Sequence, residues 1–199
     1  VAYALRSRRC FIADEMGLGK TVQALASIQA ANAYPAVIVC PASLKLNWQR
    51  EARKWLPGRR VLVVDSRTPA GQIECAAVLI VNYDILKVRP KPGAENKTRV
   101  TARDLEPEGV LAYLIARRPR ALVLDESHYA KNPKARRTMA CLAVAREIPA
   151  DGLRLLLSGT PLLNRPAELI AQLRILGRLE DLGGYSYFTR TYCRAMDTS

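Results

Sequence analysis

The sequence has little of what metal sites and membrane anchors require. It contains one histidine, His128, and five scattered cysteines without any Cys-x-x-Cys pair, which argues against a zinc site. Its apolar runs are all shorter than the roughly 18 residues that cross a bilayer, so we expect no membrane partner. Widely spaced cysteines are typical of a reducing compartment, so we expect an intracellular protein.

Acidic residues are also scarce relative to basic ones. The 199 residues include 18 Asp and Glu against 31 Lys and Arg, which gives a formal net charge of +13. A positive field of this size favours polyanions such as nucleic acid as partners. Charge alone leaves an alternative open, because arginines can also solvate helix faces without contacting a partner.

Short apolar runs alternate with helical patterns along the chain. The apolar runs cover 10–13, 36–40, 61–64, 77–81 and 121–124, and a further strand is expected over 153–157. The helical patterns cover 22–33, 44–56, 107–117, 134–147 and 166–176. Nearly all-apolar strands that alternate with helices are typical of a parallel sheet covered on both faces. We therefore predict one three-layer α/β domain, with a turn at 68–71 and an exposed insertion at 87–106. On the helix 44–56, the two tryptophans are predicted to pack into the core.

A glycine loop follows the first apolar run and precedes the first long helical pattern. It reads Asp14, Glu15, Met16, Gly17, Leu18, Gly19, Lys20 and Thr21. Glycines let backbone N–H groups turn toward an anion, and the helix adds the positive end of its dipole. Lys20 can reach the outer phosphates of a nucleotide, and Thr21 can offer its hydroxyl to Mg²⁺. The strict phosphate-loop template has glycine at position 14, so the loop alone indicates a nucleotide site without deciding it.

An acidic pair follows the apolar run 121–124. Asp125 at a strand end can hold Mg²⁺, and Glu126 beside it can polarise an attacking water. Other polar stretches follow strands at 41–43, 82–84 and 158–160. Ligands of such sheets bind at the carboxyl ends of the strands, so these stretches should meet the loop in space. Taken alone, the acidic pair could equally cap a helix.

Three of these stretches resemble signature motifs of the Swi/Snf-like branch of superfamily-two helicase-like ATPases. They are the loop 14–21, the Asp-Glu-Ser-His stretch 125–128 and the Leu-Leu-Leu-Ser-Gly-Thr-Pro stretch 155–161. The stretches 40–51 and 81–84 resemble the two DNA-facing motifs of that branch, and order and spacing agree over about residues 10–193. This branch has Asp at the position of Asp14, whereas Ser127 replaces its commoner alanine. Residues 165–169 and 192–193 are more similar to the annealing-helicase and bacterial members.

The resemblance implies the first RecA-like lobe of a two-lobe, DNA-stimulated motor, a P-loop NTPase with a largely parallel central sheet. Lys20 would bind the β and γ phosphates of ATP, Thr21 and Asp125 would hold Mg²⁺, and Glu126 would be the catalytic base. The residues expected to couple nucleotide state to DNA grip are His128, Ser158, Gly159 and Thr160. The residues expected to lie toward double-stranded or branched DNA are Pro41, Ser43, Asn82 and Tyr83.

Parts of the family pattern are missing from this sequence, which does not begin with Met. The adenine motif should lie just upstream of Val1, and the second lobe should follow an inter-lobe region that starts at 177–199. We therefore expect weak or no hydrolysis by this lobe alone. A prokaryotic cytoplasm or nucleoid is favoured over a nucleus. Two alternatives remain open: a basic nucleic-acid-binding module whose nucleotide site is a switch or vestigial, and a P-loop ATPase or kinase acting on a small molecule.

Overall fold

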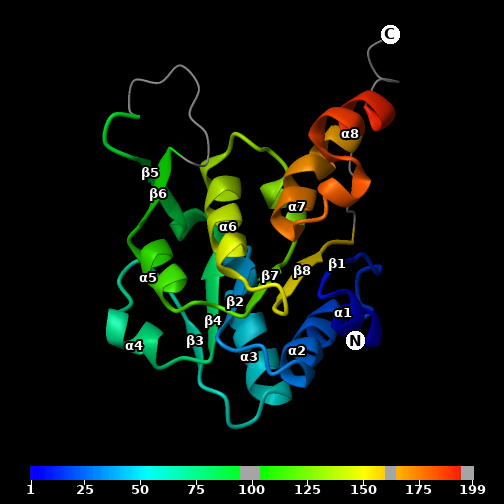
Figure 1. The fold of residues 1–199 in the computed structure, drawn as a ribbon. Helices are drawn as coiled ribbons and strands as arrows, with labels where there is room; N and C mark the ends of the chain where they lie inside the picture. Colours follow the sequence, from blue (N-terminus) through cyan, green and yellow to red (C-terminus); the bar gives the residue numbers. More distant parts are fainter. Residues whose placement is uncertain (95–103, 160–164, 194–199) are drawn as a thin grey trace.

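A parallel sheet forms the centre of the computed structural model, which describes residues 1–94, 104–159 and 165–193. Six of the described strands lie in it in the order β1-β8-β7-β2-β4-β3, and every neighbouring pair is parallel (Figure 1). The strands are β1 (Arg9–Ile12), β2 (Ala36–Cys40), β3 (Val61–Val63), β4 (Val78–Asn82), β7 (Ala121–Leu124) and β8 (Leu153–Leu157). Four of them are buried at every residue, which explains why they are apolar except at Asn82 and Arg154.

Helices cover both faces of this sheet (Figure 1). On one face lie α1 (Ala2–Ser7), α2 (Lys20–Ala30) and α3 (Lys45–Trp55), whose buried residues join one hydrophobic cluster. On the other face lie α4 (Ala70–Glu74), α5 (Val110–Ala116), α6 (Arg136–Glu147) and α7 (Leu169–Leu176). Alternate residues of β2 point to the two clusters, as the two-residue period of a strand requires. The predicted three-layer α/β architecture with a parallel sheet is confirmed.

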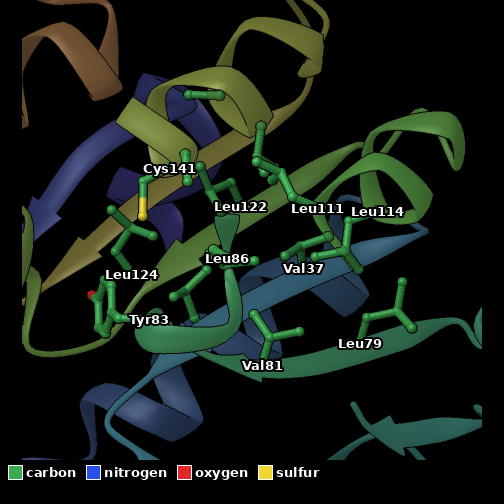
Figure 2. Packing of buried hydrophobic residues seen from close by; sticks show 14 of the residues in the cluster. Val37, Leu79, Val81, Tyr83, Leu86, Leu111, Leu114, Leu122, Leu124 and Cys141 are labelled. Carbon is green, nitrogen blue, oxygen red and sulfur yellow. The ribbon is translucent and has the colours of Figure 1, made fainter. Parts of the chain in front are cut away.

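The hydrophobic cluster between the sheet and the helices α4 to α7 shows how the sheet and its helices pack together. Figure 2 shows Leu111 and Leu114 of α5 beside strand residues such as Val37 and Leu79. Tyr83, just beyond β4, belongs to the same cluster and is 1% exposed. The core therefore extends to the carboxyl end of β4 and includes Tyr83, the residue that follows this strand.

Short helices lie at several strand ends and near the end of the described chain. They are η1 (Ala42–Leu44), η2 (Tyr83–Ile85), η3 (Ser127–Ala130), η4 (Pro166–Glu168) and η5 (Glu180–Leu182), and α8 (Gly184–Tyr192) is the last helix. Among the described residues, none of the helices combines the length and the apolar character that crossing a bilayer requires.

The structure differs from three local expectations. The expected turn at 68–71 leads into the short helix α4, which buries Ile73. The two ends of the segment 87–106 form an antiparallel ribbon, β5 (Lys87–Pro90) with β6 (Leu105–Glu108), and Val88 is buried in it. Residues 95–103 of that segment lie outside the described residues. Trp55 is 43% exposed at the end of α3, where its indole N–H donates to the carboxylate of Glu51.

Candidate functional site

The polar stretches that follow the strands gather at one edge of the sheet. Ile12 is opposite Leu157, Leu156 is opposite Leu124, and Cys40 is opposite Asn82. The chain leaves all five of these strands at the same end, because every pairing is parallel. The loop 14–19, the acidic pair 125–126 and the segments after β2, β4 and β8 therefore share that edge, as the sequence predicts.

The glycine loop connects β1 to α2 in a conformation that its glycines permit. Gly17 and Gly19 have φ of 88° and 73°, in the left-handed region that glycine adopts at low cost. The Lys20 ammonium donates to the carbonyl oxygens of Asp14 at 2.8 Å and Glu15 at 2.9 Å, so it lies folded over the loop. The loop is exposed and ends at the N-terminus of an 11-residue helix, which is an arrangement suited to an anion.

Asp125 lies at the end of β7 with both carboxylate oxygens engaged. Oδ2 accepts a hydrogen bond from the indole Nε1 of Trp48 at 2.7 Å, and Oδ1 accepts one from the backbone N–H of Glu126 at 3.0 Å. Its backbone carbonyl accepts a hydrogen bond from the Tyr83 hydroxyl at 2.7 Å. Burial raises the pKa of Asp125 above its ordinary value, whereas the two donors and the charge of Lys20 lower it in part.

Glu126 has a left-handed backbone, with φ of 49°. A non-glycine residue in this region carries strain, and such strain is common at functional sites. Its carboxylate Oε2 lies 3.2 Å from Nδ1 of His128, although the two atoms are not aligned for a hydrogen bond. The next residue, Ser127, is fully buried and donates its hydroxyl to Oε1 of Gln172 at 2.8 Å. The acidic pair is thus held from both sides.

The segment after β8 lies against the glycine loop. A Cβ atom on Gly159 would lie 3.3 Å from Cγ of Met16 and 3.9 Å from Nζ of Lys20. Ser158 is buried, and its backbone N–H donates to the carbonyl of Ile12. The structure therefore brings Ser158 and Gly159 to the loop, whereas Thr160 lies outside the described residues.

The residues at this edge fit Mg²⁺ as well as a polyphosphate. Hard oxygen ligands suit this ion, and Thr21 and Asp125 supply a hydroxyl and a carboxylate. The Asp125 carboxylate keeps acceptor capacity beyond its two hydrogen bonds. Thr21 lies in the first turn of α2, directly after Lys20.

Comparison with known proteins matches residues 3–197 to the family described as the SNF2-related domain. The chain belongs to the SNF2-related domain family. It is 32% identical over 200 residues to the Mus musculus protein "DNA annealing helicase and endonuclease ZRANB3", a match that covers 98% of this chain and 17% of that relative. It is 36% identical over 182 residues to a Caenorhabditis elegans homologue of "SWI/SNF-related matrix-associated actin-dependent regulator of chromatin subfamily A-like protein 1", covering 88% of this chain and 23% of that protein.

The fold is similar to that of a solved SNF2-type structure. The Sulfolobus solfataricus SWI2/SNF2 ATPase core in complex with double-stranded DNA has a TM-score of 0.67 and 26% identity to this chain. That match covers 94% of this chain and 34% of the solved one. The chain thus spans less than a quarter of the two curated relatives, which are animal proteins and give no support to the favoured prokaryotic source.

The residues of this SNF2-related domain that were expected to face DNA differ in exposure. Ser43 is exposed and Pro41 is half-buried, in agreement with a surface position. The position of Asn82 and Tyr83 toward DNA stays a prediction, and both side chains are buried in this conformation, at 7% and 1% exposed. The reason is that the apolar core continues past β4 and encloses the Tyr83 ring.

A groove of about 650 Å³ lies beside Tyr83, between η2, the β5-β6 ribbon and the start of α6. Its lining carries three basic and two acidic side chains, those of Lys87, Arg136, Arg137, Asp84 and Glu108. Two basic residues elsewhere serve structural contacts, since Lys131 pairs with Glu168 and Arg120 with Asp151. A smaller hollow of about 200 Å³ lies next to the glycine loop, lined in part by Tyr3, Ala4, Asp14 and Gln23.

Sequence reasoning missed two residues of the site. Trp48 was assigned to the core, and it is buried, but its N–H also holds Asp125. Gln23 donates to Oδ2 of Asp14 at 2.6 Å and to the carbonyl of Leu18, and it braces the loop from α2. A buried indole N–H needs a polar partner, and that requirement was the available signal for Trp48.

Proposed function

We propose that this SNF2-related domain binds and hydrolyses ATP and couples hydrolysis to movement on double-stranded DNA. The observation that carries this proposal is the meeting of Lys20, the Asp125–Glu126 pair and Gly159 at one edge of the sheet. Phosphoryl transfer depends mainly on positioning and on charge stabilisation, and these groups supply both. The names of the relatives, which include an annealing helicase and a DNA-bound ATPase core, support DNA as the partner.

Different residues of the chain have different roles in the proposed reaction. Lys20 exchanges the loop carbonyls for phosphate oxygens, because an anion offers its ammonium stronger hydrogen bonds than the two carbonyls do. Glu126 accepts a proton from the attacking water, and His128 beside it limits the freedom of its carboxylate. Gly159 lacks a side chain that would crowd Met16 and Lys20.

Thr21 and Asp125 are the residues that would hold Mg²⁺, with a hydroxyl and a carboxylate. When bound, the ion neutralises charge on the β and γ phosphates. The hollow beside Tyr3 and Gln23 is our candidate for the nucleotide base, because it adjoins the loop on the side of Asp14. Double-stranded or branched DNA would lie across Ser43 and the groove at Arg136 and Arg137, and a second RecA-like lobe would close over the nucleotide.

The second candidate function is a nucleotide-controlled DNA-binding switch without turnover. The net charge of +13 favours it as much as it favours the motor. The arrangement of Glu126 favours the motor, since a switch that only binds nucleotide has no use for a base in a strained conformation. Turnover in the full-length protein distinguishes the two candidates.

The test of nucleotide binding is Lys20→Ala in the full-length protein, with titration of a fluorescent ATP analogue in the presence of Mg²⁺. A charge-assisted hydrogen bond contributes about 1.5–3 kcal/mol, so we expect affinity to fall by about 10- to 100-fold. Lys54→Ala is the matched control, because Lys54 is exposed on α3 and lies over the Trp55 ring. Equal affinities for the Lys20→Ala variant and wild type would refute the assignment of the loop.

A further inference from the structure

Asp125 is held by two aromatic side chains that come from two different segments. Trp48 reaches its carboxylate across 77 residues of sequence, and Tyr83 reaches its backbone carbonyl across 42 residues. Trp48 lies in the first turn of α3, directly after η1, and Tyr83 is the first residue of η2. These are the two segments that follow β2 and β4, where the sequence resembles DNA-facing motifs.

The Trp48 side chain is fixed to its helix by packing. It is 1% exposed and belongs to the cluster formed by α1, α2, α3 and the sheet. Protein interiors are close-packed, so a large buried ring does not rotate independently of its helix. The indole has a single donor, which goes to Oδ2 of Asp125, so a displacement at the start of α3 moves or breaks that hydrogen bond.

Tyr83 makes an equivalent connection from the other segment. Its hydroxyl donates to the carbonyl of Asp125 at 2.7 Å, and its ring stacks on Tyr129 with centroids 5.4 Å apart and planes at 14°. Tyr129 lies in η3, on the far side of Glu126 in sequence. Tyr83 therefore touches the backbone before and the ring after the proposed catalytic base. Figure 2 shows its side chain beside Leu124, at the end of β7.

Exposed residues lie close in sequence to both Trp48 and Tyr83. Ser43 in η1 is exposed and stands five residues before Trp48. Asp84 in η2 is exposed and lines the same groove as Arg136 and Arg137. A duplex that contacts these surfaces would therefore act on segments whose buried residues hold Asp125.

We propose that Trp48 and Tyr83 are positioning residues that transmit DNA contact at η1 and η2 to the Asp125 carboxylate and its neighbour Glu126. This inference rests on the proposed function and states how contact with DNA would stimulate the ATPase site. Both side chains are buried, and each acts by fixing where Asp125 presents its oxygens. Coupling of this kind is reciprocal, so Mg²⁺ and nucleotide would also alter the grip on DNA.

The test uses Trp48→Phe and Tyr83→Phe in the full-length protein. Each variant keeps an aromatic ring in the core and removes one hydrogen-bond donor. Trp55→Phe is the matched control, since it removes another indole-to-carboxylate hydrogen bond from the same helix at an exposed position. The measurement is the affinity of a fluorescent ATP analogue over a range of Mg²⁺ concentrations, with and without a saturating DNA duplex.

For wild type and Trp55→Phe, we expect the duplex to raise affinity for the analogue with Mg²⁺ by the same factor. For Trp48→Phe we expect that factor to approach one, and the Mg²⁺ concentration at half-maximal binding to rise about tenfold, as loss of a hydrogen bond to a charged group predicts. Tyr83→Phe should reduce the factor as well, and it provides a second variant if Trp48→Phe does not fold.

The two levels of the proposal fail differently. If the duplex leaves wild-type affinity unchanged, both the proposed function and this inference are overturned. If wild type responds to the duplex and both phenylalanine variants respond equally, only the inference is overturned. DNA affinity without nucleotide should be the same in all four proteins, and that result identifies the effect as coupling rather than lost DNA contact.

Discussion

Ser127→Ala is expected to destabilise the domain because it leaves the side chain of Gln172 without a hydrogen-bond donor. Ser127 is fully buried, and its hydroxyl donates at 2.8 Å to Oε1 of Gln172, which is 1% exposed. Replacing the serine leaves that oxygen buried without its donor, which costs about 1–3 kcal/mol. Alanine fills nearly the same space, so the cavity contribution is small.

A double-mutant cycle separates the hydrogen bond from packing. Gln172→Leu leaves the Ser127 hydroxyl without its acceptor, and we expect about 1–2 kcal/mol of destabilisation from that change as well. The double variant Ser127→Ala/Gln172→Leu has no unpaired group, so it should be more stable than the sum of the two losses by about 1 kcal/mol. Ser186→Ala, at an exposed position on α8, should stay within about 0.5 kcal/mol of wild type.

The assay is equilibrium unfolding in urea, with the same dependence on denaturant concentration required of every variant. The reasoning is refuted if Ser127→Ala matches wild type, or if the two single losses add without a remainder. Either result would show that the turn after Glu126 is not held to α7 by this hydrogen bond.

Two further predictions concern alkaline stability and DNA binding. Burial raises the pKa of both Cys40 and Cys141 from 9.0 to about 12, so the folded chain keeps these thiols protonated where the unfolded chain loses their protons. Stability in urea should therefore fall as pH rises from 9 toward 12, by up to about 1.4 kcal/mol per pH unit for each thiol, and less steeply in Cys141→Ala; a flat profile would contradict this. The DNA affinity of the full-length protein should fall steeply as the salt concentration rises. In the double variant Arg136→Ala/Arg137→Ala, the slope of log affinity against log salt concentration should be smaller by about 2 if both side chains contact phosphates. An unchanged slope would remove the groove at α6 from the DNA path.

The strands could be predicted wherever burial is complete. The segments 36–40, 121–124 and 153–157 coincide with β2, β7 and β8, because a strand buried on both faces is mostly apolar, with Arg154 the one charged residue among them. The helix α4 and the β5-β6 ribbon could not be predicted in the same way. Each is four or five residues long, and such elements depend on neighbours in space more than on local propensity.

The site could be predicted from the sequence only up to its long-range contacts. Motif order and the parallel sheet place the loop 14–21 beside 125–126, and the structure shows that edge as expected. The hydrogen bonds of Trp48 and Tyr83 to Asp125 join residues 77 and 42 positions apart, and no periodicity in the sequence encodes them. The same limit applies to the burial of Tyr83, since that burial depends on Tyr129 and the cluster around Leu124.

The most direct test of the account is ATP turnover by the full-length protein and its Glu126→Gln variant, each with and without double-stranded DNA. We predict that DNA stimulates wild-type turnover, and that the variant binds the nucleotide as tightly as wild type but turns it over at least about 100-fold more slowly. Turnover by Glu126→Gln at the wild-type rate, or wild-type turnover that ignores DNA, would contradict a DNA-stimulated ATPase built on this edge of the sheet.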